Sequence, residues 1–167
     1  MKKLFLIIPS GLLFCCISCN NEKASSGSNA LAEKNLSAVH GIDKAIETGD
    51  ISKLGDYIAA DAIDHTGETG EVKGLDSIKA SLAIVHTMGT DMKSEVLKEL
   101  ADSFTVMQWV RYTGVSKMPM GASPAGSKYD MTVVHVSKFK DSKVTDHWEY
   151  MAMADMIKMM PPPPPNK

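Results

Sequence analysis

Two side chains in the last third of the sequence have the chemistry of a proton-transfer pair, the imidazole of His135 and the carboxylate of Asp146. Between them, the residues from Lys140 to Lys143 have the composition of a tight turn with Asp141-Ser142 as the loop. A hairpin built on this turn would place His135 and Asp146 diagonally on one face, because side chains alternate along each strand. A carboxylate that faces an apolar cavity has a raised pKa, which suits it to general acid–base catalysis. We therefore predict Asp146 as the general acid–base group and His135 as its partner.

The same predicted register gives this face a mostly apolar character. In it Phe139 opposes Val144, Ser137 opposes Asp146, His135 opposes Trp148, and Val133 opposes Tyr150. An apolar wall with a few convergent polar groups is typical of a small-molecule site. We predict that the wall of the pocket is formed by Met131, Val133, Phe139, Trp148 and Tyr150. If the loop were one residue longer, the pairing would shift, and His147 with Glu149 would join His135 instead.

Each of these residues also has a purely structural interpretation. Asp146 could be an exposed aspartate paired with a lysine, and His135 could be a hydrogen-bonded histidine of the core. In the predicted register His147 and Glu149 point away from the wall, which favours surface or subunit-contact roles. The methionines of the 117–127 loop and of the C-terminus could bind Cu(I) through their thioethers. Adaptable filling of the core is the more ordinary use of methionine.

The elements that would position these residues follow from hydrophobic periodicity. Apolar residues recur at helical spacing over residues 31–48, 51–58 and 75–89, with a short extended segment at 59–65. The period then changes to that of strands, which we expect at residues 92–100, 104–115, 128–140 and 144–153. Helices followed by antiparallel strands indicate an α+β fold. The segment 117–127, with two prolines and two glycines, is expected to be a long loop.

Composition excludes several classes of protein. The 167 residues suit one domain, and the formal net charge of −2 argues against a nucleic-acid partner. All three cysteines, Cys15, Cys16 and Cys19, lie near the N-terminus, so the body of the chain has no disulfide and no cysteine-ligated zinc.

The N-terminus has the pattern of a targeting segment. Two lysines precede a short apolar run that ends at Ile17, and Ser18-Cys19 is followed by a polar stretch. This pattern resembles a bacterial lipoprotein signal, which is cleaved before a cysteine that then carries the lipid. We predict a signal peptide at residues 1–18, lipidation at Cys19 and a flexible tether at residues 19–30. The domain would then span residues 31–157, before a Met- and Pro-rich tail at residues 158–167.

The order of elements and two short motifs resemble a known family. The motifs are Asp61-Ala62-Ile63-Asp64-His65 and the segment from Lys143 to Glu149, which includes Asp146-His147-Trp148-Glu149. Together they resemble the SnoaL-like group of the NTF2-like superfamily over roughly residues 31–156. The resemblance implies a cone-shaped, strongly curved sheet wrapped by helices around a pocket, often in a dimer packed sheet to sheet. It also implies that His65 lies at the pocket mouth and could orient a substrate, although a turn histidine beside Gly67 is the plainer interpretation.

These observations lead to a functional hypothesis with alternatives. We expect a membrane-anchored envelope lipoprotein that binds a small apolar or carbonyl-bearing molecule. As an enzyme it would catalyse cyclisation or isomerisation through Asp146 and His135, without a metal or organic cofactor. The alternatives are a non-catalytic binding protein and a copper protein based on methionine. A homodimer is expected because Val134 and Val136 would otherwise form exposed apolar surface beside His147 and Glu149.

Overall fold

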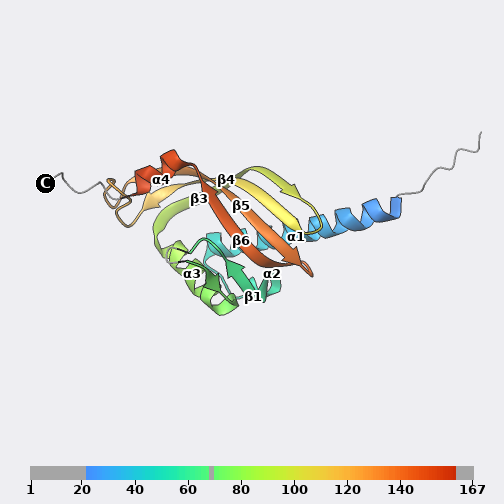
Figure 1. Ribbon diagram of the computed structural model, residues 1–167. Helices are drawn as coiled ribbons and strands as arrows, with labels where there is room; N and C mark the ends of the chain where they lie inside the picture. Colours follow the sequence, from blue (N-terminus) through green and yellow to red (C-terminus); the bar gives the residue numbers. More distant parts are fainter. Residues whose placement is uncertain (1–21, 68–69, 161–167) are drawn as a thin grey trace, which may run out of the picture.

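One curved sheet of six strands organises the chain in the computed structural model, which describes residues 22–67 and 70–160 (Figure 1). The strands lie in the order β2-β1-β6-β5-β4-β3, and β1 pairs with β6 in parallel while the other pairs are antiparallel. The predicted α+β class and the order of its main elements are confirmed. In chain order the elements are α1 (Glu22–Thr48), α2 (Leu54–Tyr57), β1 (Ile58–Asp64), β2 (Val72–Lys73), α3 (Leu75–Thr87), β3 (Gly89–Ala101), β4 (Thr105–Ser116), β5 (Lys128–Lys140), β6 (Lys143–Met151) and α4 (Met153–Met159).

Helices α1, α2 and α3 cover one face of the sheet and form the core with it. Helix α1 packs against β3, β4 and β6, and α3 packs against β1 and β3. The apolar stripe predicted for α1 is buried at Val39 and Ala45, and Leu54 of α2 is fully buried. Ile78 of α3 belongs to the same core, which continues into the sheet through Ile58, Ala62, Val106, Phe139 and Val144. Burial of this apolar surface is the main force that holds helices and sheet together.

The hairpin of β5 and β6 has the predicted turn but not the predicted register. Asp141 and Ser142 both have positive φ, 53° and 57°, as a two-residue turn of this hand requires. Phe139 opposes Val144 as predicted, but beyond this pair Lys138 opposes Asp146, and Thr145 is left as an extra residue on β6. This β-bulge shifts the pairing by one residue, so that His135 opposes Glu149 and Val136 opposes Trp148.

The consequence is that the two sets of β6 side chains exchange faces relative to the prediction. His147 and Glu149 lie on the same face as His135, while Asp146, Trp148 and Tyr150 lie on the opposite one. The expected pairings of His135 with Trp148, of Ser137 with Asp146 and of Val133 with Tyr150 are therefore wrong. The alternative register with His147 and Glu149 is the one observed, although the bulge and not a longer loop produces it.

The two ends of the described chain also differ from expectation. Helix α1 begins at Glu22, so most of the segment expected to be a flexible tether is helical, since an established helix extends at one hydrogen bond per added residue. The last strand ends at Met151, and Met153–Met159 form α4 across the expected boundary between domain and tail. The predicted signal peptide and Cys19 lie outside the described residues. In the part of the chain that is described, no helix is both long enough and apolar enough to cross a membrane.

Candidate functional site

A cavity of about 490 Å³ lies between the helices and the face of the sheet that carries His135. Its volume is within the usual range for small-molecule sites. Isoleucines, valines and methionines from α1, α3, β1 and β3 form much of its apolar wall. The polar side chains that line it are Asp43, Asp64, Gln108, Tyr112, Ser116, Tyr129, His135, Ser137, His147 and Glu149.

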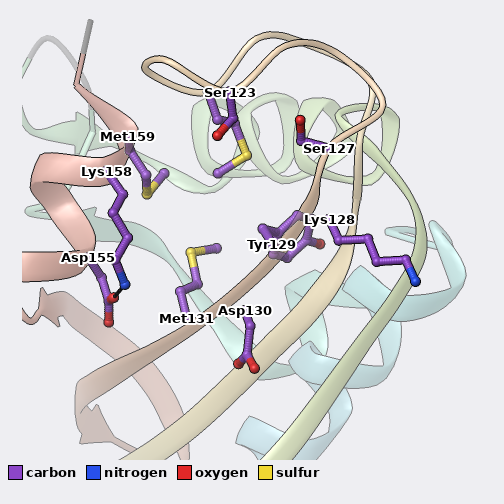
Figure 2. A pocket seen from close by; sticks show the side chains of 10 residues that line it. Ser123, Ser127, Lys128, Tyr129, Asp130, Met131, Asp155, Lys158 and Met159 are labelled. Atoms are coloured by element: carbon purple, nitrogen blue, oxygen red, sulfur yellow. Dashed lines mark hydrogen bonds and ion pairs between the residues drawn. The ribbon is translucent and has the colours of Figure 1, made fainter. Parts of the chain in front are cut away.

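Methionines close the end of the cavity that lies under the 117–127 loop. A smaller hollow of about 220 Å³ adjoins it there, and the two spaces share Met120, Tyr129, Met131 and Met159 as lining residues (Figure 2). Lys158 and Asp155 of α4 form an ion pair of 2.6 Å at the edge of this hollow. Methionine is flexible and polarizable, so this end of the cavity can adapt to ligands of different shape. Met153, which was expected to end the last strand, instead begins α4 and is exposed.

A chain of hydrogen bonds crosses the polar side of the cavity. Asp64 Oδ1 lies 3.2 Å from His147 Nδ1, His147 Nε2 lies 3.2 Å from His135 Nδ1, and His135 Nε2 lies 3.0 Å from the Tyr112 hydroxyl. One set of tautomers satisfies every contact: the Tyr112 hydroxyl donates to His135 Nε2, His135 Nδ1–H donates to His147 Nε2, and His147 Nδ1–H donates to Asp64. We call these four residues the relay.

The surroundings of the relay favour this set of protonation states at neutral pH. Burial alone would raise the pKa of Asp64, but hydrogen bonds from His147 and Thr66 outweigh it and lower the pKa to about 2. Burial, reinforced by the charge of His147, lowers the pKa of His135 to about 4. Burial also raises the pKa of the Tyr112 hydroxyl well above its ordinary value. The relay therefore holds an anionic aspartate, a neutral His135 and a protonated tyrosine.

Glu149 adds a second carboxylate at the centre of this arrangement. Its Oε1 atom lies 3.5 Å from His135 Nδ1, and its side chain is 46% exposed although it lines the cavity. The carboxylate stays accessible to solvent, but desolvation by the surrounding protein raises its pKa. A carboxyl group with a raised pKa, open to a ligand, is suited to general acid–base chemistry.

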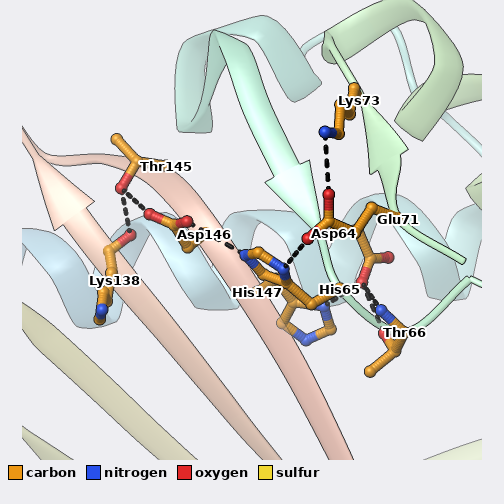
Figure 3. A network of polar contacts seen from close by, with 9 residues as sticks. All are labelled: Asp64, His65, Thr66, Glu71, Lys73, Lys138, Thr145, Asp146 and His147. Carbon is orange, nitrogen blue, oxygen red and sulfur yellow. Dashed lines mark hydrogen bonds and ion pairs between the residues drawn. The ribbon is translucent and has the colours of Figure 1, made fainter.

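Asp146 and His65, two of the predicted catalytic residues, are paired with each other outside the cavity lining (Figure 3). His65 Nε2 lies 3.1 Å from Asp146 Oδ1, and His65 Nδ1 lies 3.0 Å from Glu71 Oε1. The His65 ring stacks on Trp148 with 4.4 Å between centroids, and Lys138 Nζ lies 5.0 Å from the Trp148 ring. The structure thus brings Asp146 and His65 together but places His135 on the other face of the sheet.

The predicted pocket wall is only partly observed. Met131 lines the cavity, while Val133 and Phe139 are buried on the same face. Trp148 and Tyr150 lie on the outer face, where Tyr150 is 58% exposed, because the bulge at Thr145 reverses the direction of the β6 side chains after it.

Several residues of the cavity were not among the predicted site residues. Asp64, which belongs to the first of the two motifs noted above, ends β1. Its side chain contacts His147 on the neighbouring strand. Tyr112 faces the cavity because residues of β4 alternate from the buried Val106. Its position two strands from β6 becomes apparent only once the pairing of β4 with β5 is known.

A comparison with family models identifies the relatives of this chain. The model of the SnoaL-like polyketide cyclases matches residues 37–160, which include the C-terminal part of α1, the whole sheet and α4. The chain belongs to the SnoaL-like polyketide cyclase family. The predicted resemblance to SnoaL-like proteins is therefore confirmed. No curated protein sequence matches the chain.

Solved structures show that the fold of this SnoaL-like protein is that of its NTF2-like relatives. A provisionally assigned SnoaL-like polyketide cyclase from Jannaschia sp. CCS1 superposes with a TM-score of 0.65 at 17% identity, over 80% of this chain and 96% of that one. IdmH from Streptomyces antibioticus, a provisionally assigned polyketide cyclase, has a TM-score of 0.59 at 20% identity, over 74% and 95%. AclR from Streptomyces galilaeus, provisionally assigned as a hydroxylase, has a TM-score of 0.61 at 20% identity, over 75% and 94%.

Proposed function

We propose that this SnoaL-like protein binds a small, largely apolar molecule with a carbonyl group and moves a proton on the carbon next to that carbonyl. The observation that carries the proposal is the position of Glu149, an accessible carboxylate with a raised pKa beside the relay in a largely apolar cavity. The membership of the family, whose model is that of polyketide cyclases, supports this class of reaction.

The proposed step assigns one role to each polar group. Glu149 takes the proton from the carbon, and the electron pair of the broken C–H bond moves onto the carbonyl oxygen. The Tyr112 hydroxyl turns from His135 to donate a hydrogen bond to that oxygen, because its high pKa keeps it protonated. In isomerisation, Glu149 then returns the proton to another carbon of the enolate. In cyclisation, the enolate carbon attacks a second carbonyl, and the oxygen of that carbonyl takes the proton from Glu149.

A simple ketone tests the proposal without knowledge of the natural ligand. We expect the protein, in the presence of EDTA, to accelerate exchange of the α-protons of 2-tetralone with deuterated water, measured by NMR. Glu149→Gln should lose about 100-fold of this acceleration, since the amide cannot accept the proton. Glu95→Gln is the matched control, because Glu95 lies on an exposed part of β3.

The Asp146→Asn variant separates the two possible assignments of the general base. If it abolishes exchange while Glu149→Gln does not, Asp146 is the base, as its sequence position predicts, and the assignment to Glu149 is wrong. If the wild-type protein binds the ketone by saturation-transfer NMR but exchanges no faster than buffer, the protein is a binder and the catalytic proposal fails. Lipid anchoring at the cell envelope is a separate proposal, which depends on Cys19.

A further inference from the structure

The two imidazoles of the relay bring one nitrogen each close to the carboxylate of Glu149. Asp64 holds His147 at Nδ1, and Tyr112 holds His135 at Nε2, at 3.2 and 3.0 Å. The other two nitrogens, His147 Nε2 and His135 Nδ1, lie 3.2 Å apart, and Glu149 Oε1 lies 3.5 Å from His135 Nδ1. One ligand atom from each of these three side chains lies within 4.8 Å of the other two.

These separations are close to those of ligands around a tetrahedral metal ion. For bond lengths of about 2.0–2.2 Å, two ligands of a tetrahedral site lie about 3.3–3.6 Å apart, while octahedral neighbours lie only about 2.8–3.1 Å apart. The observed 3.2 and 3.5 Å are nearer to the tetrahedral values. Two histidines and one glutamate are also a ligand set found in catalytic zinc sites, where the fourth position stays open.

The groups behind the two histidines are those that metal sites use to orient their ligands. A histidine that binds a metal through one ring nitrogen usually donates a hydrogen bond from the N–H of the other to a carboxylate or another acceptor. This hydrogen bond fixes the tautomer and the plane of the ring. Asp64 is such a carboxylate for His147, and it is itself held by Thr66. With a metal on Nδ1, the proton of His135 would lie on Nε2, which would donate to the Tyr112 hydroxyl oxygen in place of accepting from it.

The charge of the cavity also favours a cation. Among the described residues that line it there is no lysine or arginine, while Asp43, Asp64 and Glu149 contribute carboxylates. A divalent ion in this space would meet attraction from several sides and no fixed positive charge.

We propose that His135, His147 and Glu149 bind a divalent transition-metal ion of the Zn²⁺ type, with Asp64 and Tyr112 as the positioning residues behind the two imidazoles. This goes beyond the proposed proton transfer and is an alternative use of the same groups. The lone pair of Glu149 that would accept a proton is the one that would bind the metal. Zinc should therefore inhibit proton exchange by the metal-free protein.

Zinc binding can be measured directly on the full-length chain with Cys15→Ser, Cys16→Ser and Cys19→Ser, which removes thiols that would bind zinc themselves. After EDTA treatment and dialysis, titration calorimetry with ZnCl₂ should give one ion per chain. Glu149→Gln and His147→Ala should each weaken binding at least tenfold, and Asp64→Asn about 10- to 100-fold. His40→Gln is the control, because it removes an exposed histidine on α1. Substitution by Co²⁺ should give the visible absorption of a four-coordinate site.

The outcomes separate this proposal from the proposed function. Unchanged zinc affinity in Glu149→Gln overturns the metal site, and so does an equal loss in His40→Gln, which would indicate a surface site. Glu149→Gln keeps the size of the side chain, so it decides the matter even if His147→Ala does not fold. The calorimetry contains no organic ligand, whereas the ketone exchange is measured in EDTA, so either proposal can fail while the other stands.

Discussion

At the scale of single residues, the imidazole of His65 is placed to bind its proton more tightly than a free histidine. The hydrogen bond to Asp146 is the largest influence on its pKa, and together with Glu71 it outweighs partial desolvation and raises the pKa above 6.5. The same contact lowers the pKa of Asp146 below 3.8. Both members of the pair are therefore charged at pH values between the pKa of Asp146 and the pKa of His65.

We expect NMR titration to show a midpoint for His65 above 6.5, and Asp146→Asn to bring it down. Because the folded state holds the proton of His65 more tightly than the unfolded state, the pair stabilises the protein between pH 3.8 and 6.5. Its contribution disappears as pH rises through the raised pKa of His65 or falls through the lowered pKa of Asp146. Urea denaturation should thus show a larger loss of stability for Asp146→Asn on the acid side of the His65 pKa than well above it. An equal loss on both sides would contradict this account.

The sequence indicated that a histidine and a carboxylate form the site, but it did not identify which acidic residue supplies the carboxylate. His135 was expected in the cavity and lies there, whereas Asp146 and Glu149, three positions apart, were assigned to the opposite faces from those observed. Both are acidic and both flank a histidine or tryptophan. Their catalytic roles stay predictions until the variants are measured.

At the scale of elements, the hairpin turn between β5 and β6 has the two-residue length that such hairpins favour, but its second loop residue is a serine where glycine would be less strained. Ser142 has a φ of 57°, in the left-handed region, where a side chain with a Cβ costs about 1 kcal/mol relative to glycine. Asp141 has a similar φ, but aspartate tolerates this region better than most residues.

Ser142→Gly should therefore leave the free energy of unfolding unchanged or raise it by up to about 1 kcal/mol, since relief of backbone strain offsets the greater entropy of unfolded glycine. Chemical denaturation provides the measurement. Ser142→Ala is the control and should give no gain, because alanine keeps the Cβ. If Ser142→Gly were less stable than wild type by about 1 kcal/mol, the positive φ of Ser142 would not be a source of strain in this turn.

The elements themselves were largely predictable from the sequence, and the bounds of β5, residues 128–140, were predicted without error. Strands and helices follow from local periodicity, which the sequence displays directly. The bulge was not predictable, because Thr145 has no feature that marks it as an unpaired residue, and its position depends on how β6 pairs with both β5 and β1. Since every later residue of β6 takes its direction from the bulge, this one missed residue misplaced Asp146, Trp148 and Tyr150.

At the scale of the whole molecule, the outer face of the sheet presents large apolar side chains to solvent. Met107, Trp109 and Tyr150 are 41%, 48% and 58% exposed, and Val136 lies opposite Trp148 on the same face. This surface is more apolar than the sequence suggested, since aromatic residues and not His147 and Glu149 accompany Val134 and Val136. A patch of this kind usually marks an interface.

We therefore expect a homodimer through the outer face, and Val136→Lys to convert it to a monomer, because a buried ammonium group opposes association. Sedimentation velocity at micromolar concentration gives the masses. Ser81→Lys adds the same charge on an exposed part of α3 and should leave the dimer intact. A monomeric wild-type protein would rule out this use of the face.

The N-terminal prediction concerns how the molecule is held in the cell. Cys19→Ala should abolish incorporation of an alkyne-labelled fatty acid and release the protein from the membrane fraction of a bacterial host. Cys16→Ala should retain both properties, since the lipid is predicted on Cys19. Retention of the Cys19→Ala protein in the membrane fraction would show that something other than this cysteine holds it there.

The extra residue at Thr145 decides which side chains of β6 face the interior and which face the exterior. Upstream and downstream of it the strand alternates with the same period but opposite phase, so the residues after it form two interleaved sets, one for the interior and one for the exterior. Loss of one residue here would exchange the sets, bringing Asp146, Trp148 and Tyr150 inward and turning His147 and Glu149 outward, without any amino acid being replaced. In this part of the chain, a one-residue gap in an alignment therefore changes the site more than a substitution does. In a relative with one residue fewer between the turn and the tryptophan, we expect the residues equivalent to Asp146 and Trp148 to face the cavity.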